Sequence, residues 1–496
     1  MTGLNALDLA VIVVYLVGVT LFGLRFRHKQ RTLRDYFLAG NTIPWWAIAL
    51  SIVAAETSTL TIIGVPALAY DKDFRFLQLV VGYLAGRVIV SFLFIPQYFR
   101  GELVTAYQLI ERRFGQRLRS LTAGLFLVTR AAAEGVRVFA VAIVVKVALA
   151  GALSGLSDAG RDVSSIAIVT VLTLLYTFEG GMAAVIWTDV IQLAIYLAGT
   201  LVGVFTLAHL IPGGWETISA VAGHADKFRV FDFSWHLSST YTLWAGVLGG
   251  AFLTTASHGT DQLIVQRLLS ARSQRQSQIA LLTSGVAVLV QFTLFLLIGA
   301  MLYVFYKLFP PAIAFTRSDT IFPTFVVTRL PHGVSGLLIS AILAAAMSNL
   351  SAALNSLSST TIVDFYSRFA PRSSEERRVR LSRFATIGWG VLLFGLALVA
   401  RHGGKVLEMG LSIASVAYGS LLGVFLLGVL TRKASERGAM AGMLLGFALN
   451  IYLWLFTGVA FTWYVVFGSA VTFVVGYCAS WWMPRTDLIQ PEARAG

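Results

Sequence analysis

The feature of this sequence that most restricts its fold is a series of apolar stretches, each long enough for a membrane-spanning helix, that recurs along the whole chain. A helix of roughly 20 residues crosses the hydrocarbon core of a bilayer, which is about 30 Å thick. Only 12% of the 496 residues are charged, whereas soluble domains carry roughly 25%. The short alternating segments that build a membrane β-barrel do not occur in the sequence. The sequence therefore predicts an all-α polytopic membrane protein.

The apolar stretches predict about thirteen transmembrane helices, and no segment between them is long enough to fold as a separate domain. The predicted spans cover residues 5–24, 44–70, 75–98, 120–149, 164–178, 184–210, 241–266, 277–306, 334–361, 382–400, 406–430, 438–457 and 462–482. We therefore expect a single transmembrane domain over residues 1–496.

Lysine and arginine residues indicate the orientation of these spans. Cytoplasmic loops of membrane proteins carry the excess of positive charge, and here the basic residues gather in the loops that are internal if the N-terminus is external. They are densest after the first span (Arg25, Arg27, Lys29, Arg31 and Arg34) and in the loop 362–381 (Arg368, Arg372, Arg377, Arg378 and Arg380). We predict a multi-pass protein of the cell (inner) membrane with an external N-terminus and a cytoplasmic C-terminus. This orientation accounts for the net charge of +14, and we expect neither a nucleic-acid partner nor an obligate protein partner.

The second span contains a dense cluster of polar residues. Six of the eleven residues at 51–61 are polar, and Glu56 places a carboxylate in the middle of the membrane. Because an unpaired polar group is costly in hydrocarbon, such a cluster marks a binding site or a packing seam. Gly64 and Pro66 follow it, and this composition suits a helix broken near its middle, where free carbonyl and hydroxyl groups can bind an ion. The alternative is a Ser/Thr packing seam with a proline kink, against which the charge of Glu56 argues.

The seventh span carries a similar polar interruption at 254–262. Two interrupted helices at equivalent positions of two repeats indicate a binding site near the membrane midplane. Ser257, His258 and Asp261 are also the residue types of a hydrolase triad, but a triad is defined by a geometry that near neighbours in sequence do not supply. We expect no catalysis at this position.

The ninth span presents hydroxyl and amide groups along one helical face, since Ser348, Ser351, Asn355 and Ser358 recur at helical spacing. Oxygen atoms are the ligands that hard cations such as sodium prefer. Small residues at this spacing also allow two helices to pack closely. The periodicity alone leaves both interpretations open.

Further ionisable residues lie within the fourth and sixth spans. Arg130, Glu134 and Arg137 share one face of the fourth span. An ion pair between Arg130 and Glu134 would leave Arg137 free to bind an anion, and the alternative is a structural network of all three side chains. Asp189 lies in the first turns of the sixth span.

These features favour a transporter over three other classes of membrane protein. The tail after Met483 is too short for the output domain of a sensor. The histidines show no metal-ligand spacing, so we do not expect an enzyme. A passive channel would not need an ion site. A symporter uses sodium to accumulate its solute against a gradient, and a passive channel does not.

At these positions the chain resembles the sodium:solute symporter family over nearly its whole length. The resemblance rests on Gly180, Gly181, Trp187, Thr188, Asp189 and Gln192, on Thr260, Asp261, Gln262, Val265, Gln266 and Arg267, and on Ala345, Met347, Ser348, Ser351, Asn355 and Ser356. It implies that the protein imports a small organic solute together with sodium by alternating access. It also implies a LeuT-type fold, with a leading helix and loop at 5–43, inverted five-helix repeats at 44–210 and 241–430, and two C-terminal helices at 438–482.

The resemblance also implies a main sodium site. Its ligands would be the backbone carbonyls of Ala54, Thr57 and Ala345 and the side-chain oxygens of Ser348 and Asn349. The family usually has Ser or Thr where this chain has Asn349, whose amide oxygen can also coordinate sodium.

In sialic acid symporters of this family, a second sodium site would correspond to Asp189, Ser348 and Ser351. A further hydroxyl ligand of that site is replaced here by Ala352. A site that lacks one ligand should bind sodium weakly, so we predict one coupled sodium ion.

For the solute, the resemblance places the binding pocket between the two broken spans. The residues expected to line it are Glu56, Ser58, Thr61, Gln78, Arg137, Thr255, Ser257 and His258. The spacing of Ser58 and Thr61 and the position of Arg137 are similar to the sialic acid branch, which implies an anionic solute such as sialic acid or another carboxylate. Glu56 fits an anionic solute only if it is paired with an arginine or protonated, and sugars and amino acids remain alternatives.

Overall fold

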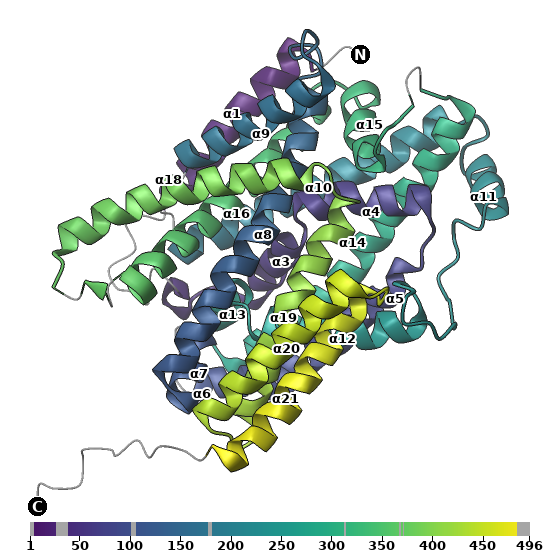
Figure 1. Ribbon diagram of the computed structural model, residues 1–496. Helices are drawn as coiled ribbons and strands as arrows, with labels where there is room; N and C mark the ends of the chain where they lie inside the picture. The colour runs from purple at the N-terminus through teal and green to yellow at the C-terminus, as the bar shows by residue number, and fades with distance from the viewer. Residues whose placement is uncertain are drawn as a thin grey trace, which may run out of the picture.

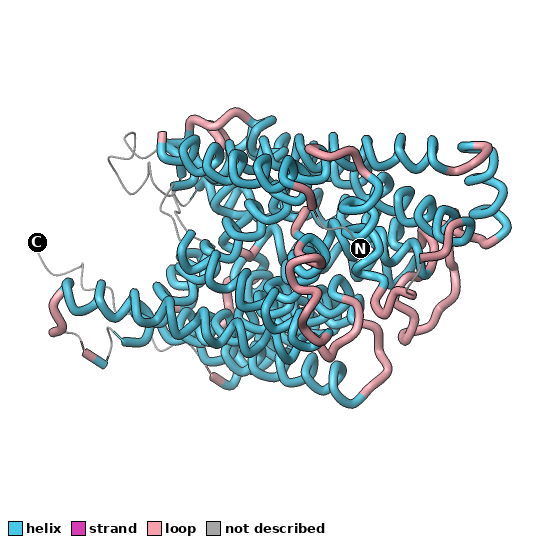
Figure 2. Tube along the Cα trace, turned by 90° about the horizontal axis from the view of Figure 1, so that it is seen from above, coloured by secondary structure: helices cyan, strands magenta, loops and turns pink. Residues whose placement is uncertain are grey.

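The computed structural model describes residues 4–25, 38–100, 106–176, 181–311, 314–366, 369–370 and 372–483. Within these residues the chain forms helices joined by loops (Figure 2), and the only β-type contact is an isolated bridge between Ile43 and Ala271. The prediction of an all-helical protein is confirmed for this part of the chain. Several basic residues used to predict the orientation lie outside it, namely Arg27, Lys29, Arg31, Arg34 and Arg368.

The long helices are α1 (Ala6–Leu24), α8 (Gln116–Ala148), α9 (Asp158–Tyr176), α10 (Gly181–Leu210), α14 (Gln274–Leu308), α16 (Val334–Thr360), α18 (Glu375–Ala400), α19 (Val406–Leu430), α20 (Glu436–Phe456) and α21 (Tyr464–Trp482). The shorter ones are α3 (Trp45–Glu56), α4 (Thr59–Asp71), α5 (Phe76–Ile89), α6 (Ile95–Arg100), α7 (Ala106–Phe114), α11 (Gly214–His224), α12 (Leu243–Gly259), α13 (Gln262–Leu269) and α15 (Ile321–Arg329). A π-helical turn at Val90–Phe94 joins α5 to α6, so that the two form one long helix.

Each predicted span overlaps one of these helices or a pair of them. Among the described residues, eight helices are long and apolar enough to cross a membrane, and the bent pair of α3 and α4 raises the number to nine. Helix α8 is not among the eight, since Arg130, Glu134 and Arg137 interrupt its apolar sequence. A protein with many membrane spans is therefore confirmed, while the count of thirteen remains a prediction.

Helices α3 and α4 are the two halves of one broken helix and meet at an angle of 64°. Between them, Thr57 has φ −81° and ψ 62°, and Ser58 has an extended backbone with φ −74° and ψ 169°. Serine and threonine favour such breaks because their hydroxyl groups compete for backbone hydrogen bonds. Here Thr61 Oγ1 donates a hydrogen bond to the Glu56 carbonyl at 2.9 Å. The predicted break in the second span is confirmed.

A second break separates α12 from α13 at Thr260 and Asp261. Asp261 Oδ1 accepts a hydrogen bond from the backbone nitrogen of Leu263 at 2.9 Å and so caps the start of α13. This break lies within the polar segment 254–262, as the sequence predicted.

The two breaks lie in the interior of the helix assembly. Helix α4 contacts α8, α14 and α19, and α12 contacts α5 and α19. The C-terminal helices α20 and α21 pack side by side against α19 (Figure 1). Residues of both breaks are consequently surrounded by long helices that carry polar side chains toward them.

The contact between α5 and α12 depends on the absence of a side chain at Gly82. A Cβ atom on Gly82 would lie 2.5 Å from the carbonyl oxygen of Gly246 and 2.6 Å from that of Val247. Both oxygens belong to the backbone of α12, so the whole helix would have to move. Gly18 on α1 provides a contrast, since no heavy atom of the described chain lies within 4 Å of its Cβ position.

We therefore expect Gly82→Ala to destabilise the protein by about 1–3 kcal/mol, the usual cost of overpacking a filled interior. Thermal unfolding of the purified protein in detergent measures this loss, with Gly18→Ala as the matched control that should leave the melting temperature unchanged or slightly raised. Equal melting temperatures for the two variants would contradict the packing described.

Candidate functional site

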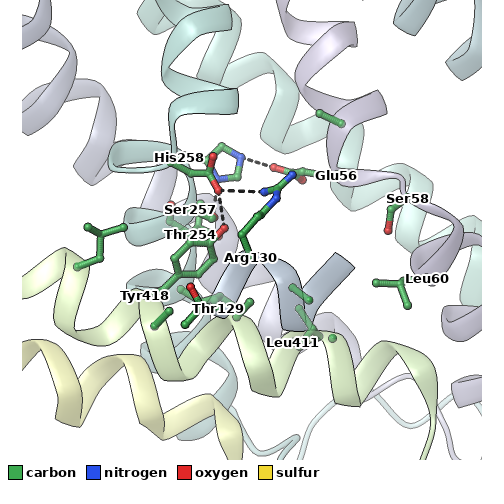
Figure 3. Close-up of a pocket in the computed structure, with 18 of the residues that line it drawn as sticks. Glu56, Ser58, Leu60, Thr129, Arg130, Thr254, Ser257, His258, Leu411 and Tyr418 are labelled. Atoms are coloured by element: carbon green, nitrogen blue, oxygen red, sulfur yellow. Dashed lines mark hydrogen bonds and ion pairs between the residues drawn. The ribbon is translucent and has the colours of Figure 1, made fainter. Parts of the chain in front are cut away.

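A cavity of about 260 Å³ lies at the two helix breaks. Residues of α8 that line it recur every three or four positions from Thr122 to Arg137, and residues of α19 do the same from Leu407 to Leu421. At 1.5 Å per residue, each of these faces is roughly 20 Å long, so the cavity is a slot that follows the two helices. The broken helices supply seven of the polar residues that line it: Glu56, Ser58, Thr61, Thr254, Ser257, His258 and Asp261. Figure 3 shows Glu56, Ser58, Thr254, Ser257 and His258 among them.

Glu56, the last residue of α3, forms the first of two charged clusters at this cavity. Its Oε1 contacts the guanidinium group of Arg87 on α5 and Nε2 of His258 on α12. His258 Nδ1 lies 2.9 Å from Ser257 Oγ. This geometry fits an imidazole whose Nε2–H donates to Glu56 while Nδ1 accepts from the Ser257 hydroxyl. Arg87 therefore supplies the positive charge that balances Glu56.

The second cluster centres on Glu134 of α8. Glu134 Oε1 lies 2.6 Å from Arg137 Nη1 and 2.9 Å from Arg130 Nε. Arg130 Nη1 also lies 3.8 Å from Asp261 Oδ2, which accepts a hydrogen bond from the Tyr418 hydroxyl at 2.8 Å. Of the two interpretations that the sequence left open, the structure shows the network of all three side chains, because the Glu134 carboxylate is shared by both guanidinium groups.

The charges in and directly behind the cavity wall cancel. Three guanidinium groups (Arg87, Arg130 and Arg137) face three carboxylates (Glu56, Glu134 and Asp261). A neutral His258 leaves the sum at zero. This balance is required by the low dielectric of the membrane interior, where unpaired charges are strongly disfavoured.

The residues predicted to bind the main sodium ion lie on the first helix break and on α16. Ala54 is buried, and the hydroxyl of Thr57 lies 2.6 Å from the Val53 carbonyl and 3.0 Å from Gln291 Oε1. Ala345 is buried and Ser348 and Asn349 are half-buried on α16, which packs against α4.

The carboxylate predicted for the second sodium site has a protein cation beside it. Asp189 Oδ2 lies 2.9 Å from Arg267 Nη2 and accepts a hydrogen bond from Ser51 Oγ at 2.6 Å. Arg267 Nε donates to the same Ser51 oxygen at 2.9 Å. Both charged side chains are buried. The other two residues of the predicted set, Ser348 and Ser351, lie on α16, which contacts the helix of Asp189.

Two predicted solute-binding residues do not line the cavity. Gln78 Nε2 donates to the Tyr241 carbonyl at 3.1 Å, and its Oε1 accepts from the Asp232 nitrogen at 3.1 Å, so it fixes a loop to the start of α5. Thr255 Oγ1 donates to the Ala251 carbonyl at 2.7 Å within α12. The prediction that Gln78 and Thr255 line the solute pocket is therefore corrected. The sequence shows that a side chain is polar, but it does not show which helical face that side chain occupies.

Sequence reasoning assigned no role to Arg87 or Gln291. Both are buried, Arg87 against Glu56 and Gln291 against Thr57. A signal was present for Arg87, since a basic residue in the middle of an apolar span needs a partner. Its partner is distant in sequence and could not be named without the fold.

A broken helix pair around a polar, charge-balanced cavity inside a bundle of apolar helices defines a solute transporter. Residues 36–446 match the sodium:solute symporter family. The chain belongs to this family, and it is therefore a multi-pass membrane protein that couples a small solute to sodium. The predictions of a sodium-dependent symporter, and of a transporter rather than an enzyme, are confirmed.

Several relatives align over nearly the whole chain. The sodium/sialic acid symporter SiaT of Proteus mirabilis is 30% identical, covering 95% of this chain and 94% of that protein. The sodium/sialic acid symporter NanT of Aliivibrio fischeri is 28% identical, covering 95% and 92%. The sodium-coupled monocarboxylate transporter 1 of Xenopus laevis is 28% identical, covering 86% and 67%. The structure of a sodium-coupled sialic acid symporter in a substrate-bound outward-open state has a TM-score of 0.79 at 27% identity, covering 96% of this chain and 98% of the other.

The Asp189–Arg267 pair yields a test of the buried charge network. Arg267→Gln should destabilise the protein by about 3–5 kcal/mol, since it leaves a buried carboxylate without its cation. The double variant Asp189→Asn/Arg267→Gln should recover much of this loss. Arg275→Gln, at an exposed arginine on α14, is the matched control and should not change the melting temperature. If the double variant is no more stable than Arg267→Gln, the pair does not carry the effect.

Proposed function

We propose that this protein imports a small organic monocarboxylate together with one sodium ion by alternating access. The observation that carries the proposal is the cavity at the two helix breaks, whose wall holds the guanidinium groups of Arg130 and Arg137. Relatives named for sialic acid and for monocarboxylates support the same class of solute. Uptake of a panel of acids, sugars and amino acids into proteoliposomes, with and without an inward sodium gradient, tests it directly.

Arg137 is the group proposed to bind the solute carboxylate. Its side chain is 20% exposed and lines the cavity. In the described part of the chain it hydrogen-bonds to Glu134, and its Nε has no partner. A guanidinium group offers five N–H donors, so Arg137 retains donors for a carboxylate even while it contacts Glu134. Ser58 and Ser257 on the broken helices are proposed to bind other polar groups of the solute.

Sodium is proposed to bind where the first break meets α16, through Ala54, Thr57, Ala345, Ser348 and Asn349. Carbonyl groups released from helical hydrogen bonding are suitable ligands for such an ion. In a cavity whose own charges cancel, one sodium ion and one monovalent anion together keep the total charge at zero. The two substrates would then stabilise one another through their opposite charges.

A single coupled sodium ion is supported by the surroundings of Asp189. The guanidinium group of Arg267 already neutralises this carboxylate, and Ala352 lacks the hydroxyl expected of a ligand. A tethered cation at this position removes the electrostatic reason for a second sodium ion to bind.

The proposed topology has thirteen spans, an external N-terminus and a cytoplasmic C-terminus in the cell (inner) membrane. The LeuT-type repeats would be 44–210 and 241–430, and each would begin with a broken helix, α3–α4 and α12–α13. In this orientation the outer ends of α4 and α19 are held together by ion pairs Lys72–Glu408 at 3.1 Å and Asp71–Lys405 at 2.7 Å. Opening of the cavity to the outside would require these two ends to separate.

Arg137→Ala should weaken solute affinity at least tenfold. A charge-assisted hydrogen bond contributes about 1.5–3 kcal/mol, and about 1.4 kcal/mol corresponds to one decade in affinity. The concentration dependence of sodium-driven uptake measures the change. Arg161→Ala, at an arginine in the α9 region away from the cavity, is the control and should behave as the wild type. Uptake of a neutral sugar with unchanged affinity in Arg137→Ala would overturn the assignment.

Sodium activation of uptake should follow a Hill coefficient near one and, for a monovalent anion, carry no net current. Ser348→Ala should raise the half-saturating sodium concentration several-fold without changing that coefficient, because it removes one ligand of the single site. A tenfold sodium gradient supplies about 1.4 kcal/mol, so it supports at most about tenfold accumulation. A coefficient near two, with inward current, would instead establish a second site, and Asp189→Asn should then reduce the coefficient toward one.

A further inference from the structure

Arg87 lies near the middle of the apolar helix Phe76–Arg100 and is buried behind the wall of the cavity. Its side chain is 1% exposed and contacts the Glu56 carboxylate. Arg87 Nε donates to Ser284 Oγ at 3.2 Å, and Nη1 donates to the Tyr83 carbonyl at 3.3 Å. These contacts with α14 and with its own helix fix the guanidinium group in a position from which it reaches the end of α3.

Glu56 belongs to the cavity wall itself. Its side chain is 16% exposed and lines the cavity at the residue where α3 ends. The C-terminal end of a helix carries partial negative charge, and the carboxylate adds a full negative charge at the same place. The backbone carbonyls of Ala54 and Thr57, proposed to bind sodium, are its neighbours in sequence. Without a nearby cation, this end of the cavity would be strongly negative.

Among the described residues, Arg87 and His258 contact the Glu56 carboxylate, and of these two Arg87 alone carries a permanent charge. His258 contacts the same oxygen, but an imidazole is ordinarily neutral above pH 7. Arg130 and Arg137 share Glu134, and Arg130 also faces Asp261. If Arg87 were neutral, the two remaining guanidinium groups would face three carboxylates and the cavity would carry one net negative charge.

We infer that Arg87 determines the ionic selectivity of the transporter by cancelling Glu56, so that the cavity accepts sodium and an anionic solute as a neutral pair. This inference rests on the proposed anionic solute. Arg87 is a specificity-determining residue that acts through Glu56 and does not itself line the cavity.

The inference predicts changes of opposite sign for the two substrates. Loss of the Arg87 charge should tighten sodium binding and weaken anion binding. Each change should be roughly tenfold, which is the effect of one unit charge over a distance on the order of 10 Å at an effective dielectric constant of about 20. Loss of the Glu56 charge should do the reverse. A merely structural role for the pair would weaken both substrates in both variants.

Sodium alone is the probe for the decisive experiment, since it requires no knowledge of the solute. The stabilisation of the purified protein by sodium is measured as a thermal shift at pH 8, with choline replacing sodium to hold ionic strength constant. We expect the half-saturating sodium concentration to fall about tenfold in Arg87→Gln, to rise about tenfold in Glu56→Gln, and to return to within about threefold of wild type in Glu56→Gln/Arg87→Gln. Arg75→Gln, at the external end of the same helix, is the matched control and should not differ from wild type.

Wild-type sodium affinity in both single variants, or weakened affinity in both, overturns the inference. If Arg87→Gln does not fold, Glu56→Gln and the double variant still decide the matter, because weakened sodium binding in the first must be restored in the second. Uptake of N-acetylneuraminate, lactate and glucose by the wild-type protein separates this outcome from the proposed function. If the protein transports glucose and neither of the acids, the proposal of an anionic solute is wrong. The sodium titration would still show whether Arg87 balances Glu56.

Discussion

Every charged side chain that this protein places inside the membrane has to find a counter-charge, and the arrangement of its central helices follows from that requirement. Glu56 joins α3 to α5 and α12 through Arg87 and His258. Asp189 joins α10 to α13 through Arg267. Burying each ion pair costs desolvation free energy. The pair still holds its helices together, because separating the two partners would leave a buried charge uncompensated. These pairs therefore fix which helices meet at the cavity more firmly than apolar packing alone could, because apolar side chains contact lipid tails and other helices equally well.

The same pairing would allow a cavity that has six charged groups in or directly behind its wall to accept the proposed anion together with sodium. Because the charges of the cavity cancel, neither proposed substrate would meet a large opposing field, and each would make the binding of the other more favourable. The same principle applies to Asp189. Its carboxylate could otherwise attract sodium, but the guanidinium group of Arg267 lies beside it and neutralises its charge. The two helix breaks add polar backbone groups at the cavity without adding net charge. Selectivity would then depend on the balance between residues rather than on any one of them.

Local patterns predicted the two helix breaks correctly, since serine and threonine hydroxyl groups compete for the backbone hydrogen bonds of a helix. The family resemblance assigned Glu56, Ser58, Thr61, Ser257, His258 and Arg137 to the solute pocket, and all of them line the cavity. Gln78 and Thr255 were assigned to the pocket wrongly, because a polar side chain can equally satisfy a nearby carbonyl. The sequence left the pairing of Arg137 open for a related reason. Glu134 has two arginines within reach along one helical face, and sequence spacing does not say that both will bind it.

By itself, the sequence determined that this chain is a helical membrane protein with two interrupted spans, since length, hydropathy and hydroxyl content act within a single helix. Its motifs also determined the family. Only the tertiary structure decided that Arg87 balances Glu56 and that Arg267 holds Asp189, because the partners lie 31 and 78 residues apart. Charges separated by such distances along the chain meet only after the helices have packed. Which arginine each carboxylate pairs with is therefore a property of the folded protein.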